Sequence, residues 1–186
     1  MVGIFSLWLP IALSAVLVFG VSSIVHMVLR YHRNDYSQAS GEADLLEAMR
    51  KQGTSPGNYY FPHCASMKEM GTPEMTQKFE QGPVGFLTVL PSGPPKMGKQ
   101  LTSWFVFSVL VSVVVAYLTG RTVAADATYL RVFRVAGTVA FVAYAGAEPV
   151  MSIWKGQKWS TTVKTMFDGL LYSLVTAGAF AGFWPN

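Results

Sequence analysis

The stretch Tyr59–Met70, YYFPHCASMKEM, contains the single cysteine of the chain and gathers several soft metal ligands. His63 directly precedes Cys64, and Met67 and Met70 follow at three-residue spacing. Thiolate and thioether sulfurs favour Cu(I), and imidazole suits copper or zinc. These four residues therefore form one candidate metal site, which would make the chain a protein that binds or traffics copper.

The same stretch also has an ordinary structural interpretation, which we favour. A structural zinc site generally uses four Cys or His ligands in paired spacing, and here there is one cysteine. Neighbours such as His63 and Cys64 need not point toward one ion, and methionine commonly fills gaps in packed surfaces. Thiol catalysis would need a base and an orienting partner within hydrogen-bond reach of Cys64.

Other catalytic patterns are absent from the sequence. We find no phosphate-binding glycine loop, dinucleotide fingerprint, HExxH motif or serine elbow. The sequence therefore predicts a protein that is not an enzyme.

Composition indicates a membrane protein. The 186-residue chain is 51% hydrophobic and only 13% charged, whereas soluble domains carry about 25% charged residues. A spanning helix needs about 20 mostly apolar residues, and four stretches qualify, at about 4–29, 101–118, 130–154 and 166–184. We predict an all-α integral membrane fold with four transmembrane helices and a small mixed α/β cytoplasmic insert between the first and second.

The predicted organisation is a first transmembrane helix in 1–30, a cytoplasmic insert in 31–100 and a three-helix transmembrane region in 101–186. Of the 14 basic residues, all but Arg121, Arg131 and Arg134 fall on the side of the insert. Because excess Lys and Arg mark the cytoplasmic side, both termini should be periplasmic if the source is a Gram-negative bacterium.

The insert contains local structural signals. The segment 40–53, SGEADLLEAMRKQG, predicts a helix that Ser40 caps and Gly53 ends. The segments NYYF and VGFLTVL are rich in aromatic and β-branched residues, so they predict two paired strands.

Ionisable residues at membrane depth are functional candidates by default. The predicted spans carry His26, Arg131, Arg134, Glu148 and Asp168. His26 is of the type that ligates haem in helical bundles, but the other spans supply no second histidine. Arg134 and Glu148 lie about 21 Å apart along one helix, so they cannot pair.

The span centres are apolar or small, which argues against an ion path, although a small transporter or channel stays an alternative. We expect Arg131 and Arg134 to extend outward to the headgroups. We expect Glu148 and Asp168 to bond to Lys155, to Lys158 or to a neighbouring helix end.

Small residues recur every four positions in the last predicted span, at Gly169, Ser173, Ala177 and Ala181. Such stripes let transmembrane helices approach closely. Contact with another subunit and packing inside one bundle explain the stripe equally well.

Several segments resemble a family of bacterial multi-pass inner-membrane proteins of about this size with no established activity. They are YYFPHC, GPVGFLTVLPSGPPKMGK, FRVAGTVAFVAYAGA and SIWKGQKWSTTVKTMFDGLLYSLVTAGAFAGFWP. The resemblance covers most of the chain after residue 30. It implies a bacterial inner-membrane setting and no functional residue.

Together these patterns favour a non-catalytic membrane protein that acts as a structural or accessory subunit. Its expected partners are the lipid bilayer and either other membrane subunits or copies of itself, without nucleic acid. No cofactor is favoured, with copper or haem as the alternatives.

Overall fold

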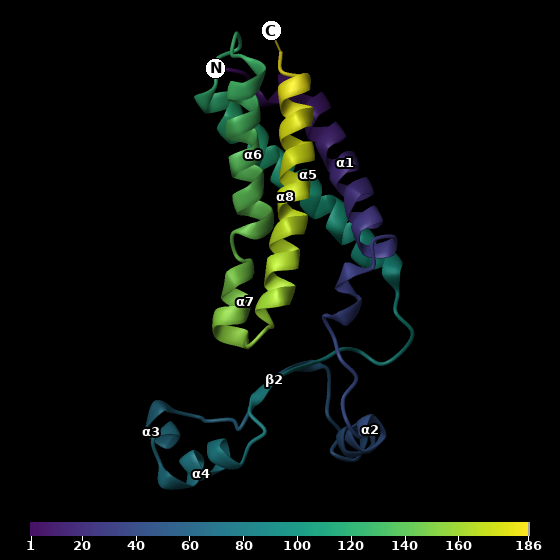
Figure 1. The fold of residues 1–186 in the computed structure, drawn as a ribbon, viewed down its shortest axis with the longest axis vertical. Coiled ribbons are helices and arrows are strands. Elements are labelled where there is room, and N and C mark those ends of the chain that lie inside the picture. The colour runs from purple at the N-terminus through teal and green to yellow at the C-terminus, as the bar shows by residue number, and fades with distance from the viewer. Residues whose placement is uncertain (186) are drawn as a thin grey trace. The chain divides into compact units, whose positions relative to one another are not determined.

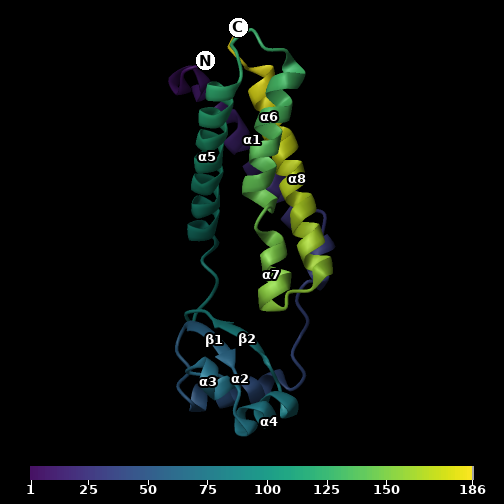
Figure 2. The same cartoon turned by 90° about the vertical axis from the view of Figure 1, so that its left-hand side faces the viewer.

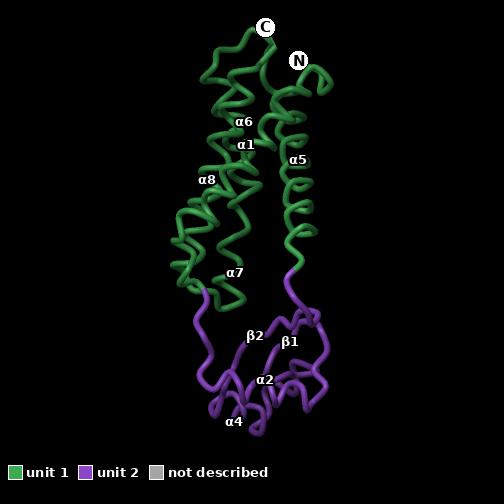
Figure 3. Tube along the Cα trace, turned by 90° about the vertical axis from the view of Figure 1, so that its right-hand side faces the viewer, with its two compact units in different colours: residues 1–35, 96–186 green, residues 36–95 purple. Residues whose placement is uncertain are grey.

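The computed structural model describes residues 1–185, which divide into two compact units. Residues 1–35 and the chain from 96 onward form the first, which we call the membrane unit, and residues 36–95 form the second, the insert unit (Figure 3).

The membrane unit is helical, and its main helices run alongside one another (Figures 1 and 2). Its elements are η1 (Ile4–Leu7), α1 (Trp8–Met27), η2 (Tyr31–Asn34), α5 (Met97–Thr122), α6 (Tyr129–Ala145), α7 (Glu148–Lys155) and α8 (Trp159–Gly182).

Three segments are long and apolar enough to cross a membrane: Ile4–Met27, Met97–Thr122 and Tyr129–Lys155. They coincide with the first three predicted spans, as expected for a membrane protein. The fourth predicted span coincides with α8, which is 24 residues long. The helix α8 is not among the three membrane-capable segments. Its first half carries the charged residues Lys164 and Asp168.

The third predicted span contains a break that the hydropathy pattern does not show. Between α6 and α7 the helix is interrupted at Gly146 and Ala147 (Figure 1). Pro149 lacks an N–H group, and its ring clashes with the carbonyl group four residues earlier in a regular helix. The N–H of Val150 instead donates to the Ala147 carbonyl at 3.1 Å, which starts a new helix.

Small side chains bring α8 close to α6. Ala136 and Ala140 on α6 are fully buried, as is Ala177 on α8. A Cβ atom added to Gly137 would lie 3.1 Å from that of Ala177, and one added to Gly169 would lie 2.8 Å from that of Ala145.

The rest of the predicted small-residue stripe is also buried, with Ser173 at 3% and Ala181 at 8% exposure. Packing inside this chain therefore accounts for the stripe. On the other side of the bundle, α1 and α5 are joined by a hydrogen bond of 2.8 Å between the hydroxyl groups of Ser14 and Ser112.

The insert unit contains the predicted pair of strands. Its elements are α2 (Glu42–Lys51), β1 (Gly57–Phe61), α3 (Met67–Met70), α4 (Pro73–Gln81) and β2 (Gly85–Val89). The strands pair antiparallel, with Gly57 opposite Val89 and Phe61 opposite Gly85.

The prediction that Ser40 caps α2 is wrong. Gly41 occupies the N-cap position in a left-handed conformation with φ of 68°, and no side chain caps the helix. Gly41 adopts this φ at little cost, which moves the turn one residue beyond Ser40. The helix ends at Lys51 with Gln52 as its C-cap, and Gly53, with φ of 63°, follows the cap at the position where glycine was predicted to close the helix.

The close approach at Gly169 gives a stability prediction. Gly169→Ala should destabilise the membrane unit by about 1–3 kcal/mol, because the added methyl group forces α6 and α8 apart. Gly178→Ala is the matched control, since a Cβ there has no atom within 4 Å and alanine favours helix. Thermal unfolding of the purified variants in detergent measures both. A Gly169→Ala variant as stable as the control would contradict the described packing.

Candidate functional site

The membrane unit holds a buried carboxylate that is paired on both oxygens. Asp168, on α8, is 2% exposed. The Tyr31 hydroxyl group donates a hydrogen bond to its Oδ1 atom. The Nε2 atom of His32 lies 2.8 Å from its Oδ2 atom. The end of the first membrane helix is thereby tied to the last helix of the chain.

The network continues on the other side of the His32 ring. The Nδ1 atom of His32 lies 2.6 Å from Oδ2 of Asp35. The Nζ atom of Lys164 donates to Oδ1 of Asp35 at 2.6 Å and to the Tyr31 carbonyl at 2.7 Å. Lys164 and Asp168 are four residues apart on α8, so they share one face. The side chains therefore form a row in which carboxylates alternate with nitrogen-bearing groups, in the order Asp168, His32, Asp35 and Lys164.

The backbone after α1 explains why these side chains reach α8. Arg30 adopts a left-handed conformation with φ of 49°, and it is the one non-glycine residue with positive φ among residues 1–185. This turn ends the helical path of α1 and begins η2. Hydrogen bonds from Arg33 N–H to the Arg30 carbonyl and from Asp35 N–H to the His32 carbonyl close the short helix.

The network also sets the ionisation of its members outside the spans. Burial raises the pKa of Asp35, but the hydrogen bonds from Lys164 and His32 and their charges outweigh burial and hold the pKa below its usual value. Burial, with the hydrogen bond and the charge of Asp168, raises the pKa of Tyr31 well above its ordinary range. Asp35 is therefore an anion at neutral pH, and Tyr31 keeps its proton and donates it.

A second histidine lies beside this network. His26 is exposed in the last turn of α1, and its ring centroid is 5.0 Å from that of His32. Its Nε2 atom lies 3.5 Å from the Tyr172 hydroxyl group. One potential ligand atom from each of His26, His32 and Asp168 lies within 4.8 Å of the other two.

The structure brings together part of the predicted intramembrane set. His26 and Asp168 join one cluster, and Glu148 lies close enough to Asp168 for their charges to repel each other. Arg131 and Arg134 are exposed on α6. Asp168 is hydrogen-bonded to Tyr31 and His32, which follow the end of the first span. That Glu148 and Asp168 also bond to Lys155, Lys158 or a neighbouring helix end stays a prediction.

Sequence reasoning missed most of the network. None of the sites predicted from the sequence includes Tyr31, His32, Asp35 or Lys164. Two signals were available. The polar run YHRND follows directly after an apolar span, and the spacing of Lys164 and Asp168 places two opposite charges on one helix face.

The predicted copper stretch lies in the insert unit. Met67 and Met70 belong to the single turn α3, with exposures of 80% and 40%. Cys64 is a free thiol of intermediate exposure. Among residues 1–185, the one group of His, Cys, Asp or Glu side chains arranged for a metal ion is His26, His32 and Asp168. Copper binding at the Cys64 stretch stays a prediction.

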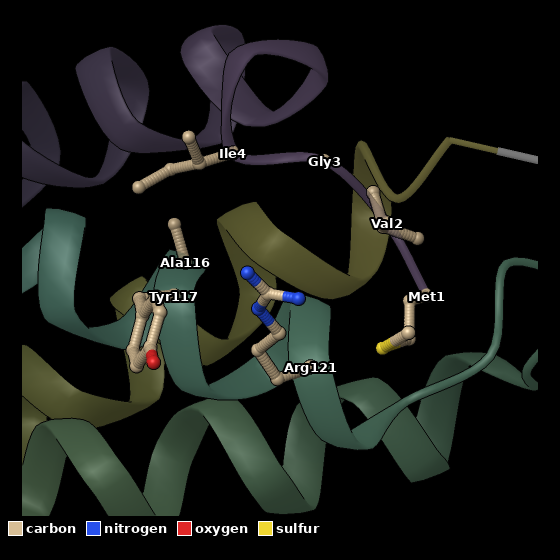
Figure 4. Close-up of a pocket in the computed structure, with 7 residues that line it drawn as sticks. All are labelled: Met1, Val2, Gly3, Ile4, Ala116, Tyr117 and Arg121. Carbon is tan, nitrogen blue, oxygen red and sulfur yellow. The ribbon is translucent and has the colours of Figure 1, made fainter.

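A pocket at the other end of α1 offers less chemistry (Figure 4). Its lining residues are Met1, Val2, Gly3, Ile4, Ala116, Tyr117 and Arg121. Among these lining residues, the ionisable side chains are Tyr117 and Arg121. The guanidinium carbon of Arg121 lies 5.8 Å from the Tyr117 ring centroid. Val2 N–H donates to the Gly120 carbonyl at 2.9 Å, so the pocket lies where the N-terminus packs on α5.

No protein-family model matches the chain, and neither the curated proteins nor the solved structures include a match.

The Asp35 network predicts a stability difference that depends on pH. Asp35→Asn should cost about 1.5–3 kcal/mol at pH 7, because Lys164 and His32 lose a charged hydrogen-bond acceptor. The lowered pKa of Asp35 means that its contribution is complete above the unfolded-state value of 3.8. It is lost as the pH falls through the lower folded-state pKa.

The gap in melting temperature between wild type and Asp35→Asn should therefore narrow when the pH is lowered from 7 to about 3. Asp126→Asn, at an exposed loop position, is the control and should show no gap at either pH. A gap of equal size at both pH values would show that the Asp35 charge does not stabilise the fold.

Proposed function

We propose that this chain is a non-catalytic multi-pass membrane protein that serves as an accessory subunit of a membrane complex, with the insert unit binding the partner. One observation carries this proposal. Met75, at 4% exposure, is the one hydrophobic side chain that the insert unit buries among its residues, 36–95.

A unit of about 60 residues is marginal even with a normal core, because folding must offset a large loss of conformational entropy. In this unit large apolar side chains remain on the surface. On α2, which buries none of its residues, Leu45 is 47% exposed and Leu46 is 45% exposed. On the sheet, Phe86 is 48% exposed. Covering such side chains supplies about 25 cal/mol per Å², so a bound partner would complete the core.

Charge favours a protein partner over the lipid surface. Residues 36–95 contain six acidic side chains (Glu42, Asp44, Glu47, Glu69, Glu74 and Glu80) and four basic ones (Arg50, Lys51, Lys68 and Lys78). Anionic cytoplasmic leaflets attract basic segments, whereas this segment has a formal charge of −2. We therefore assign its apolar α2 face to another protein subunit.

The proposal includes the finer membrane arrangement. In it α8 is a fourth span, since it is 24 residues long and packs against both α6 and α1. The excess of basic residues on the side of the insert unit supports a cytoplasmic insert unit and periplasmic termini in a bacterial inner membrane. Lipid then surrounds the exposed apolar side chains of the membrane unit.

A native mass spectrum of the protein, extracted gently from its own membranes at its natural level, tests the proposal. We expect the wild type in a complex with a different polypeptide. The double variant Leu45→Glu with Leu46→Glu should appear as the chain alone, because two carboxylates cannot be buried in an apolar contact. Met67→Glu is the control, since Met67 is an exposed apolar residue of the same unit, at 80% exposure.

Three results would contradict the proposal. The first is a wild type found only as a monomer or homo-oligomer, and the second is a wild type with lipid as its sole companion. A complex that survives the double variant unchanged would show that the partner does not bind the α2 face.

A further inference from the structure

We propose that His26, His32 and Asp168 form a binding site for a divalent first-row transition metal ion, of which Zn²⁺ is the representative. The site lies at the end of α1, where the chain leaves the first span. It uses none of the residues proposed to bind a partner, so it is independent of the accessory-subunit proposal.

The spacing of the ligand atoms fits one ion after small side-chain rotations. One ligand atom from each residue lies within 4.8 Å of the other two. Around a tetrahedral zinc ion with bonds of about 2.1 Å, ligand atoms are about 3.4 Å apart. The three residues come from α1, η2 and α8, so the ion would join three separate elements.

The surroundings of His32 resemble the support that metal-bound histidines generally have. A ligating histidine almost always donates its second ring N–H to a carboxylate or carbonyl group. Here the Nδ1 atom of His32 lies 2.6 Å from Asp35, and Lys164 in turn holds Asp35 at 2.6 Å. This arrangement sets the ring orientation and directs the Nε2 atom toward Asp168.

The ion would replace a proton that the same atoms now share. The Nε2 atom of His32 and Oδ2 of Asp168 are 2.8 Å apart, which requires a hydrogen between them. On binding, Nε2 gives this proton to water, and both atoms then coordinate the ion. The hydrogen bond from Tyr31 to the other Asp168 oxygen is retained, so Asp168 keeps an orienting partner.

The donor set decides the class of metal. Two imidazole nitrogens and one carboxylate oxygen suit Zn²⁺, Fe²⁺ or Co²⁺, whereas Mg²⁺ and Ca²⁺ prefer oxygen ligands and Cu(I) prefers sulfur. Three protein ligands leave a fourth position for water or a small anion. The exposed His26 leaves the site accessible from the surface.

Cobalt provides a direct test, because tetrahedral Co²⁺ has strong visible absorption that distinguishes nitrogen and oxygen ligands from thiolate. The full-length protein is purified in detergent, stripped with a chelator and titrated with Co²⁺, and Zn²⁺ is then used in competition. We expect one equivalent of Co²⁺ with visible bands and without thiolate charge transfer. Zn²⁺ should displace it and raise the melting temperature of the protein.

Matched variants identify the ligands. His26→Ala should weaken binding at least 100-fold, which is the upper end of the loss seen for removing a supporting residue. Because His26 is exposed, this variant should fold normally. Asp35→Asn should weaken binding about 10–100-fold. His63→Ala and Cys64→Ser, both in the insert unit, are the controls and should bind as the wild type does.

The opposite results would overturn the site. Wild-type protein that binds Co²⁺ and Zn²⁺ no better than His26→Ala would show that the cluster is a hydrogen-bonded junction only. Binding that Cys64→Ser abolishes would assign the metal to the copper stretch. Neither result changes the mass of a native complex, so the metal site and the accessory-subunit proposal fail separately.

Discussion

The buried carboxylate of Asp168 is the constraint on which the membrane unit depends. A carboxylate at 2% exposure is costly unless hydrogen bonds replace the lost water. Its donors are Tyr31 and His32, so the chain that leaves the first span must turn back onto α8. The left-handed backbone conformation of Arg30 and the short helix η2 produce that turn. The boundary of the membrane unit at Asp35 follows from the same contacts.

Close helix packing limits where another protein can bind. Gly169 and Ala177 are used against α6, and Ser112 bonds to Ser14 on α1, so these small-residue faces are filled within one chain. The membrane unit then presents mostly large apolar side chains of the kind that lipid covers. The insert unit differs, because its apolar residues face solvent on an acidic surface. This contrast, more than the absence of catalytic motifs, favours partner binding through the insert.

The sequence was sufficient for the elements with a strong local pattern and insufficient for contacts between distant residues. The apolar runs identified three membrane-capable helices, and the β-branched and aromatic runs identified the hairpin. The helices α3 and α4 were missed, although Ser66 and Thr72 cap them and Pro73 follows the second cap, a pattern typical of helix starts. The bond between His32 and Asp168 joins residues 136 positions apart. Sequence periodicity does not reveal a pairing over such a distance. Within its own predicted span, Asp168 is a single acidic residue on an apolar helix.

The position of the cluster links its chemistry to the organisation of the chain. Tyr31, His32 and Asp35 are among the last residues of the membrane unit before the insert unit, which begins at Tyr36. Hydrogen bonds to α8 therefore hold the residues from which the insert starts. A metal ion bound by His26, His32 and Asp168 would replace one directional hydrogen bond with coordinate bonds to three elements. Because such bonds require ordered ligands, the ion would favour the same path of residues 26–35 that the hydrogen bonds already select.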